Sequence, residues 1–163
     1  MKTVCMAGIC LLLVGCVYEV PLATESQQEV NRALLGKWLT VADDGAVQEL
    51  LVLPLGAKEY LVSYPSNAKD GMFFRAFVAQ TGTTPVMQFQ LLGSANGEAP
   101  ADRRVYHFGT FRLDGPQLVL RLINPEVVSK DVTTTEALAK AIAAQRENPA
   151  LFAESTTFQR LGK

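Results

Sequence analysis

His107 is the only histidine of the 163-residue chain and the first candidate for catalysis or metal binding. It lies with Arg104 and Tyr106 in a run of residues typical of a β-strand. A zinc site needs three or four ligands, and no further ligands stand at a suitable spacing from this histidine. We therefore expect His107 to be a partly buried or surface side chain and not a metal ligand.

Two serines lie near groups that could activate them, but their surroundings are typical of loops. Ser94 belongs to the sequence Gly-Ser-Ala-Asn-Gly, in which the serine is misplaced for a nucleophile elbow and no strand-to-helix turn follows. Ser129 is followed directly by Lys130, and adjacent loop residues rarely point at one another. We expect Ser94 to lie in a hairpin loop and Ser129 in a longer connection.

Asp43 and Asp44 resemble a pair of catalytic carboxylates, but they precede Gly45, and this order is typical of a turn. The glycines of the chain are isolated from one another, so no loop is expected to cradle a phosphate. These patterns predict a protein without catalytic residues, bound metal or cofactor. The alternative, an enzyme, requires a cleft in which His107 meets two carboxylates.

The charge balance gives no reason to expect nucleic acid or an anionic lipid surface as a partner. The whole chain has 15 basic and 16 acidic residues, a net charge of −1. Lys2 is the only charged residue among residues 1–15. Without this segment the chain has 14 basic and 16 acidic residues, a net charge of −2. Hydrophobic residues make up 48% of the chain, which is ordinary for a globular domain, and the length suits one domain plus a targeting segment.

The N-terminus has the parts of an export signal that ends at a cysteine. Lys2 gives a positive start, and residues 4–14 are nearly all apolar but too few to span a bilayer. The run ends in Leu13-Val14-Gly15-Cys16, which resembles the signal of bacterial lipoproteins: leucine, a small or β-branched residue, glycine and then cysteine. The other cysteines, Cys5 and Cys10, precede this motif, so neither a disulfide nor a cysteine-bound metal is expected in the exported part.

The resemblance to bacterial lipoproteins implies cleavage between Gly15 and Cys16 and a lipid on the sulfur of Cys16. In that family the thiol receives a diacylglycerol, and the new amine is usually acylated too, often with palmitate; two or three chains anchor a protein stably. In Gram-negative lipoproteins an aspartate directly after the cysteine is typical of proteins retained in the inner membrane. This chain has Val17 there, and the absence of the aspartate favours the outer membrane, with the domain facing the periplasm. The expected divisions are a signal peptide (1–15), a lipidated cysteine with a tether (16–26) and one domain (27–163).

Turn signals at regular distances predict a β-rich domain after a short N-terminal helix over residues 27–35. Asp-Gly, Asn-Gly and single glycines separate runs rich in β-branched, leucine and aromatic residues, and such dipeptides suit tight hairpins. Successive hairpins form an antiparallel meander. The runs predict strands over 37–42, 47–53, 59–64, 72–80, 86–92, 104–113 and 117–123.

A second helix and a last strand complete the predicted domain. Thr133 as N-cap and Glu136 reaching back to it have the pattern of a capping box, and residues 137–146 are rich in helix formers. Residues 156–161 have the pattern of a strand. About eight strands favour a small closed barrel, because pairing of the last strand with the first leaves no open edge. The predicted fold class is therefore mainly β, an antiparallel barrel with one helix before its last strand.

Gly36-Lys37-Trp38, at the start of the first predicted strand, is similar to the Gly-x-Trp of lipocalin-like barrels. In that group an arginine near the final strand packs over the tryptophan. The resemblance implies that Arg160 takes this place over Trp38 and that the two side chains close the barrel. Lipocalins also have a Thr-Asp-Tyr motif, which this chain lacks.

The predicted strands carry many aromatic side chains, which either fill the barrel or line an apolar pocket in it. Three functions remain open. The leading hypothesis is a membrane-anchored, non-catalytic binding or interaction domain of unknown specific role, for which a partner protein of the cell envelope and a small molecule are equally expected. The alternatives are a lipocalin-like carrier of a lipid or small hydrophobic ligand, and an enzyme. The first is preferred because the chain combines an anchor with a barrel pattern and lacks a catalytic constellation.

Overall fold

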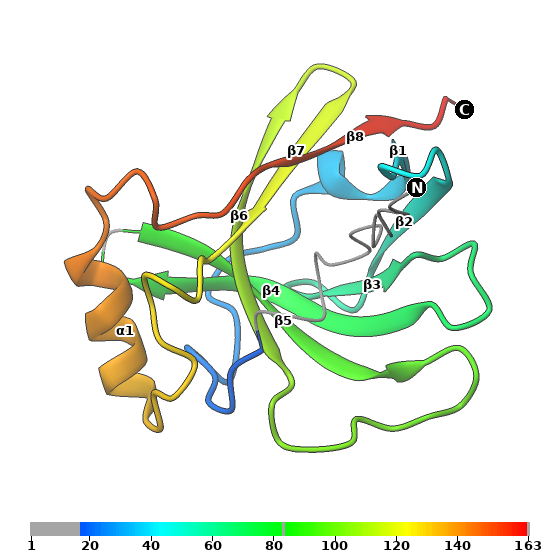
Figure 1. Cartoon of the computed structure of the whole chain (residues 1–163). Helices are drawn as coiled ribbons and strands as arrows, with labels where there is room; N and C mark the ends of the chain where they lie inside the picture. The colour runs from blue at the N-terminus through cyan, green and yellow to red at the C-terminus, as the bar shows by residue number, and fades with distance from the viewer. Residues whose placement is uncertain (1–16, 83, 163) are drawn as a thin grey trace, which may run out of the picture.

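Eight antiparallel strands close into a barrel in the computed structural model, which describes residues 17–82 and 84–162 (Figure 1). The strands follow one another around the barrel in chain order, so the predicted meander is confirmed. Each predicted strand is present, with ends that differ by no more than two residues. The strands are β1 (Gly36–Val41), β2 (Val47–Pro54), β3 (Tyr60–Tyr64), β4 (Met72–Thr81), β5 (Thr84–Ser94), β6 (Tyr106–Asp114), β7 (Gln117–Leu122) and β8 (Thr156–Arg160).

The barrel closes where β8 pairs with β1, as the sequence predicts. Trp38 faces Arg160 and Leu39 faces Gln159 across this seam, while the other edge of β8 pairs with β7. Gly36 begins β1 with a φ of +120°, a backbone conformation that favours glycine. A Cβ at this position would also lie 3.4 Å from a guanidinium nitrogen of Arg160. Glycine therefore lets the first strand start close beside the last one.

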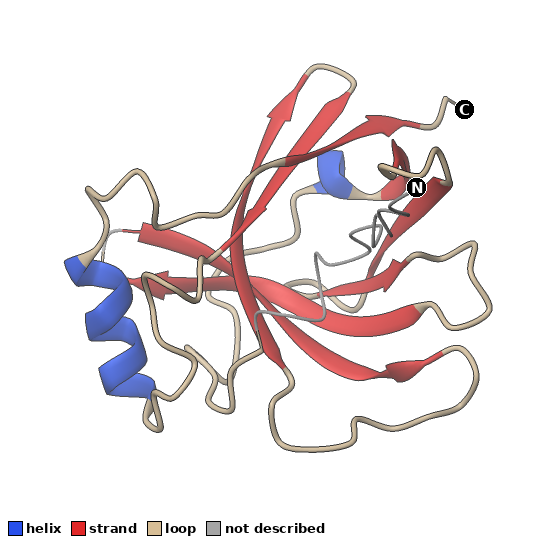
Figure 2. Ribbon diagram, viewed as in Figure 1, coloured by secondary structure: helices blue, strands red, loops and turns tan. Residues whose placement is uncertain are grey.

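One α-helix, α1 (Thr135–Ala144), lies beside the ends of β4 and β5 (Figure 2). The predicted capping box is wrong by one residue, because the N-cap is Thr134 and not Thr133. The Thr134 hydroxyl accepts a hydrogen bond from the Ala137 N–H at 3.1 Å. Thr135 donates instead to the carbonyl of Pro21 at 2.7 Å, and this tertiary bond selects which of three consecutive threonines caps the helix.

The predicted helix over residues 27–35 is not found, and a single 3-10 turn, η1 (Arg32–Leu34), stands in its place. Asn31 caps the turn by accepting the Ala33 N–H at 3.0 Å. The N–H of Val30 donates to the carbonyl of Ala57 at 2.9 Å. This bond to the β2–β3 connection holds the chain before Asn31 in an extended form, so tertiary contacts override the helical spacing of the sequence.

Apolar side chains form two cores on opposite faces of the same strands. One core lies inside the barrel and includes Trp38, Phe74 and Phe89. The other lies outside the barrel wall, where Phe77 of β4 and Phe108 of β6 pack under α1 and the N-terminal segment. Alternate residues of β4 therefore point into different cores, which explains why the sequence of this strand is apolar on both faces.

Residues 17–26, expected to form a tether, lie packed against the barrel. Tyr18 is fully buried (0% exposed). Its N–H donates to the carbonyl of Tyr106 at 2.8 Å, and its carbonyl accepts the Tyr106 N–H at 3.1 Å. Leu22 and Ser26 are buried as well. We call residues 17–26 the N-terminal strap. The predicted cleavage and lipidation residues, Gly15 and Cys16, lie outside the described residues.

Candidate functional site

The structure brings together Trp38 and Arg160, the pair expected to close the barrel. The guanidinium carbon of Arg160 lies 4.1 Å from the centroid of the Trp38 ring. Arg160 also donates to the carbonyls of Ala33 and Leu35, the latter at 3.1 Å. The indole N–H of Trp38 donates to the Leu34 carbonyl at 2.9 Å. These contacts join η1, β1 and β8 at one end of the barrel, which is a structural role.

Side chains fill most of the barrel interior. A cavity of about 50 Å³ remains between Leu34 of η1, Phe89 and Phe111, and the other side chains that line it are apolar except for Tyr60. Pockets for drug-sized ligands measure about 300–1,000 Å³. This cavity is therefore too small for a lipid or a comparable ligand in this arrangement of side chains.

His107 is almost fully buried (1% exposed), which is deeper than the sequence led us to expect. It faces Phe89 across the β5–β6 ladder, and its ring lies edge-on to Phe74 at a centroid distance of 5.7 Å. The Nδ1 atom has no hydrogen-bond partner within the described part of the chain. Burial lowers the pKa of His107 to about 4, so the imidazole is neutral at neutral pH.

The remaining candidates for catalysis take part in separate turns. Asp43 and Asp44 lie between β1 and β2, where the Asp44 carboxylate accepts the Ala46 N–H at 2.9 Å. Ser94 ends β5, and its hydroxyl bonds to a side chain of the same hairpin loop. The Ser129 hydroxyl accepts the N–H of the residue two positions later, in the connection between β7 and α1. Within residues 17–82 and 84–162, no three acidic, histidine or cysteine side chains gather to hold a metal ion.

An open groove crosses the outer face of the β6–β7 hairpin and has a volume of about 860 Å³. Arg121 shapes its wall: the guanidinium carbon lies 5.8 Å from the centroid of the Phe152 ring. The same side chain donates to the carbonyls of Phe152 at 2.6 Å and Ala153 at 2.9 Å. These bonds hold the segment before β8 beside the hairpin. The groove is lined by Thr110, Phe111, Arg112, Val119, Arg121, Glu154 and Ser155.

The strand β6 has an unpaired edge beside this groove. Pairing between β5 and β6 ends at Met87 and Gly109, although β6 continues for five more residues. The next hydrogen-bonded pair would join Pro85 to Phe111, and proline has no N–H to donate. Phe111 and Leu113 therefore direct their main-chain N–H and C=O groups away from β7, with no partner strand in the described ranges.

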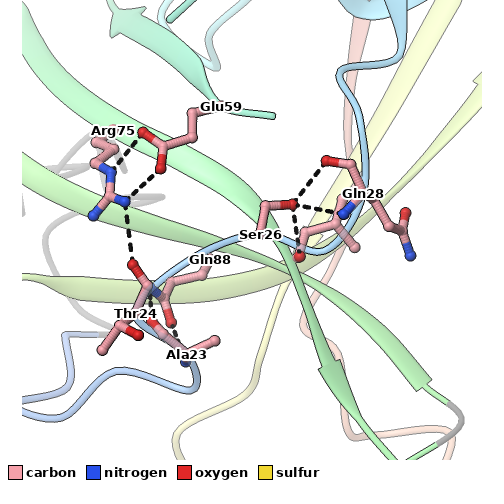
Figure 3. A network of polar contacts seen from close by, with 8 residues as sticks. Ala23, Thr24, Ser26, Gln28, Glu59, Arg75 and Gln88 are labelled. Carbon is pink, nitrogen blue, oxygen red and sulfur yellow. Dashed lines mark hydrogen bonds and ion pairs between the residues drawn. The ribbon is translucent and has the colours of Figure 1, made fainter. Parts of the chain in front are cut away.

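Polar side chains of β4 and β5 hold the N-terminal strap on the outer face of the barrel (Figure 3). The Gln88 side chain accepts the N–H groups of Leu22 at 2.7 Å and Ala23 at 3.2 Å, and it donates to the Ala23 carbonyl at 3.0 Å. Gln88 is 1% exposed, so its amide satisfies buried main-chain groups that lack a β-strand partner.

Arg75 makes the second attachment of the strap. Its Nε donates to Glu59 at 2.8 Å, and a terminal nitrogen donates to the carbonyl of Thr24 at 3.2 Å (Figure 3). The hydrogen bond from Arg75 lowers the pKa of Glu59 below its usual range, although burial acts in the opposite direction. Further along, the Ser26 hydroxyl lies 3.3 Å from the carbonyl of Val78 in β4.

Sequence reasoning missed both the docked strap and the groove. A signal for the strap was present, since Tyr18, Val20 and Leu22 alternate with polar residues or proline, as in a half-buried extended segment. The groove had no comparable signal, because it depends on how the segment before β8 lies beside the β6–β7 hairpin. The sequence shows Pro85 within the predicted β-rich region. Its effect, the loss of a hydrogen bond between β5 and β6, can be inferred only when the register of the two strands is known.

Comparisons of the chain with protein-family models, with curated proteins and with solved structures find no match. Among the residues that the structure describes, no helix is both long and apolar enough to cross a membrane.

Proposed function

We propose that this protein is a lipoprotein of the bacterial cell envelope, anchored by lipid on Cys16, and that its barrel is a non-catalytic domain that binds a partner protein. One observation carries the binding role: an open groove of about 860 Å³ lies on the outer face of the β6–β7 hairpin, whereas the cavity described between the apolar side chains of the barrel measures about 50 Å³. A large outer groove beside a small inner cavity is better suited to hold a partner on the surface.

The anchor is supported by the motif Leu13-Val14-Gly15-Cys16 and by the short apolar run before it. Val17 after the cysteine favours the outer membrane, with the domain facing the periplasm. Intact-mass measurement of the protein from native membranes tests this part. The expected mass lacks residues 1–15 and includes acyl groups; a mass that retains residues 1–15 contradicts the proposal.

The partner that best fits the groove is a protein with an extended segment. The free edge of β6 offers the main-chain groups of Phe111 and Leu113, and an added strand would pair with them. Arg112 and Glu154 at the groove supply charges of both signs for side-chain contacts. Main-chain bonds would give affinity, and the groove would select the side chains of the segment.

A matched pair of substitutions tests the groove. Val119→Glu places a larger side chain in the groove. Residue 119 faces Arg112 in the β6–β7 register, so the new carboxylate forms a favourable cross-strand pair with that arginine. Val41→Glu makes the same change on an exposed residue of β1 (67% exposed), outside the groove. After crosslinking in intact cells, we expect a specific envelope protein to be recovered with the wild type and with Val41→Glu, and lost with Val119→Glu. Equal recovery with both variants contradicts a partner site in the groove.

A second candidate function, a lipocalin-like carrier of a small hydrophobic ligand, is favoured by the largely apolar lining of the interior cavity. The contact between Trp38 and Arg160 also resembles lipocalin-like barrels. This function requires the interior to expand around the ligand. Native mass spectrometry of protein purified in mild detergent decides the matter: a retained lipid beyond the covalent anchor supports the carrier, and protein without one argues against it.

A further inference from the structure

The N-terminal strap begins one residue after the proposed lipidation site, and its first contacts are firm. Tyr18 is 0% exposed and exchanges two main-chain hydrogen bonds with Tyr106. Its hydroxyl donates to the carbonyl of Val128 at 2.8 Å, and its ring lies 5.2 Å from that of Phe108. Tyr18 is therefore bound both by β6 and by the connection that precedes α1.

The strap stays attached beyond Tyr18. The carbonyl of Pro21 accepts the hydroxyl of Thr135 at 2.7 Å. Gln88 binds Leu22 and Ala23, and Arg75 binds Thr24, as described above. No stretch of the strap is long enough to act as a flexible spacer, since attachments follow one another at nearly every second residue.

Covalent geometry then limits how far the domain can lie from its anchor. Only Val17 separates Tyr18 from the proposed lipidation residue in the sequence, and two residues of extended chain reach roughly 7 Å at most. We propose that the strap holds the barrel directly against the bilayer, with one defined face on the lipid headgroups. This inference rests on the proposed lipidation of Cys16 and adds an orientation to it.

The face nearest to the anchor follows from the ion pairs around Tyr18. Glu19 lies 3.6 Å from Arg103, and Arg104 lies 3.2 Å from Asp131. We call these four residues the proximal face. The Arg103 and Asp131 side chains are 89% and 84% exposed, so both remain available to a neighbouring surface. Two guanidinium groups and two carboxylates match a layer of zwitterionic headgroups, whose phosphates and amines offer both charges.

The opposite end of the molecule is the tip of the β6–β7 hairpin. Figure 1 shows the strap and this hairpin tip at opposite ends of β6. The strand has nine residues, so at about 3.4 Å per residue Asp114 lies roughly 27 Å from Tyr106. With the proximal face on the membrane, the groove of the β6–β7 hairpin points away from it, towards a partner in the aqueous space.

A pair of labelled variants tests the orientation. Arg103→Cys and Asp114→Cys each place a thiol at an exposed end of an ion pair, one on the proximal face and one at the hairpin tip. The full-length lipidated protein is reconstituted in vesicles of phosphatidylethanolamine and phosphatidylglycerol that contain lipids with a nitroxide quencher on the headgroup. The unsubstituted protein, treated alike, gives the background labelling. We expect strong quenching of a fluorophore at position 103 and little at position 114.

A linker variant shows whether the strap causes this difference. Insertion of ten Gly and Ser residues between Val17 and Tyr18 adds a flexible spacer of roughly 17 Å root-mean-square length without changing any contact of Tyr18. Quenching at position 103 should then fall towards that at position 114.

The outcomes separate this inference from the proposed function. Acyl groups on Cys16 together with equal quenching at positions 103 and 114 overturn the orientation but leave the lipoprotein intact. Quenching at position 103 that persists in the linker variant shows an affinity of the face for lipid that does not depend on the strap, and it overturns the mechanism proposed here. An intact mass without acyl groups overturns the lipoprotein and, with it, the inference.

Discussion

Arg160 links three parts of the barrel end through one guanidinium group. It covers the ring of the buried Trp38, and it donates to the carbonyls of Ala33 within η1 and of Leu35 directly after it. The β1–β8 seam has only two residue pairs in register, so side-chain contacts must supply part of the closure. A planar group that stacks on the indole and bonds sideways to carbonyls suits this place, and the compact ammonium of lysine lacks this planar shape.

Arg160→Ala should therefore lower the free energy of unfolding by about 1–2 kcal/mol, from the lost cation–π contact and the carbonyls left without donors. Urea unfolding followed by the fluorescence of Trp38, the only tryptophan, measures the change. Arg160→Lys keeps the charge but not the planar shape and should recover less than half of the loss. Full recovery with lysine would show that charge alone holds the seam.

His107 makes stability depend on pH. Its folded-state pKa of about 4 lies below the ordinary value of 6.5, so between these pH values the unfolded chain binds a proton that the folded chain does not. The stabilisation is complete above pH 6.5 and is lost as the pH falls towards 4, by about 3 kcal/mol in total. Glu59 acts in a lower range, because its lowered pKa means that its contribution is lost only below about pH 4.5.

His107→Leu separates this effect from general acid sensitivity. Leucine is close to histidine in size and does not titrate, so the free energy of unfolding should become nearly independent of pH between about 6.5 and 5, above the range in which Glu59 acts. At pH 7.5 the variant should be at least as stable as the wild type, because it removes an unpartnered buried Nδ1. Urea titrations at a series of pH values measure both quantities, and a slope that survives the substitution would assign the pH dependence to other groups.

At the scale of elements, the sequence predicted those strands, turns and helices whose positions depend on neighbouring residues in the chain. Turn dipeptides such as Asp44-Gly45 separated the strands correctly, and helix formers located α1 to within a few residues. The cap, the helix over 27–35 and the tether were decided by contacts distant in sequence. Gln88 binds Leu22 across 66 residues, for example, and no local pattern contains that pairing.

The candidate site was less predictable than the fold for the same reason. The Trp38–Arg160 contact was expected only through a family resemblance, while the groove arises where the segment before β8 meets a hairpin from another part of the chain. The burial of His107 followed from Phe74 and Phe89, which meet it only once β4, β5 and β6 have paired in this register. The sequence shows which residue types are present, but it does not show which of them come into contact in the folded chain.

The attachment of the strap depends on the side-chain amide of Gln88. Gln88→Ala removes three hydrogen bonds to Leu22 and Ala23 and leaves buried main-chain groups without partners. We expect the amides of Leu22 and Ala23 to exchange with deuterium much faster in the variant, because the strap opens locally. The amides of β1 and β2, which lie across the barrel from β5, should keep their protection. Unchanged exchange at Leu22 would show that the apolar contacts of the strap suffice.

At the scale of the whole molecule, two cores share one set of strands. β4, β5 and β6 turn alternate residues into the barrel and into the outer layer under α1. Loss of either core would leave one face of these strands exposed, so neither layer is expected to be stable alone. The strap packs on the outer core. The proposed lipid anchor is therefore attached to a layer that shares its strands with the barrel.

Ile142 tests this coupling, because it is fully buried (0% exposed) in the outer core, whereas Trp38 lies in the core inside the barrel. Ile142→Ala should lower the free energy of unfolding by about 2–5 kcal/mol. If the cores are coupled, Trp38 fluorescence and far-ultraviolet circular dichroism will report one transition, shifted to lower urea by the same amount. Lys140→Ala, an exposed change on the same helix, is the control and should leave the midpoint nearly unchanged. A Trp38 transition that stays in place while the helix signal is lost would show that α1 and the outer core unfold separately from the barrel, and the strap would then be an attachment to a weaker layer.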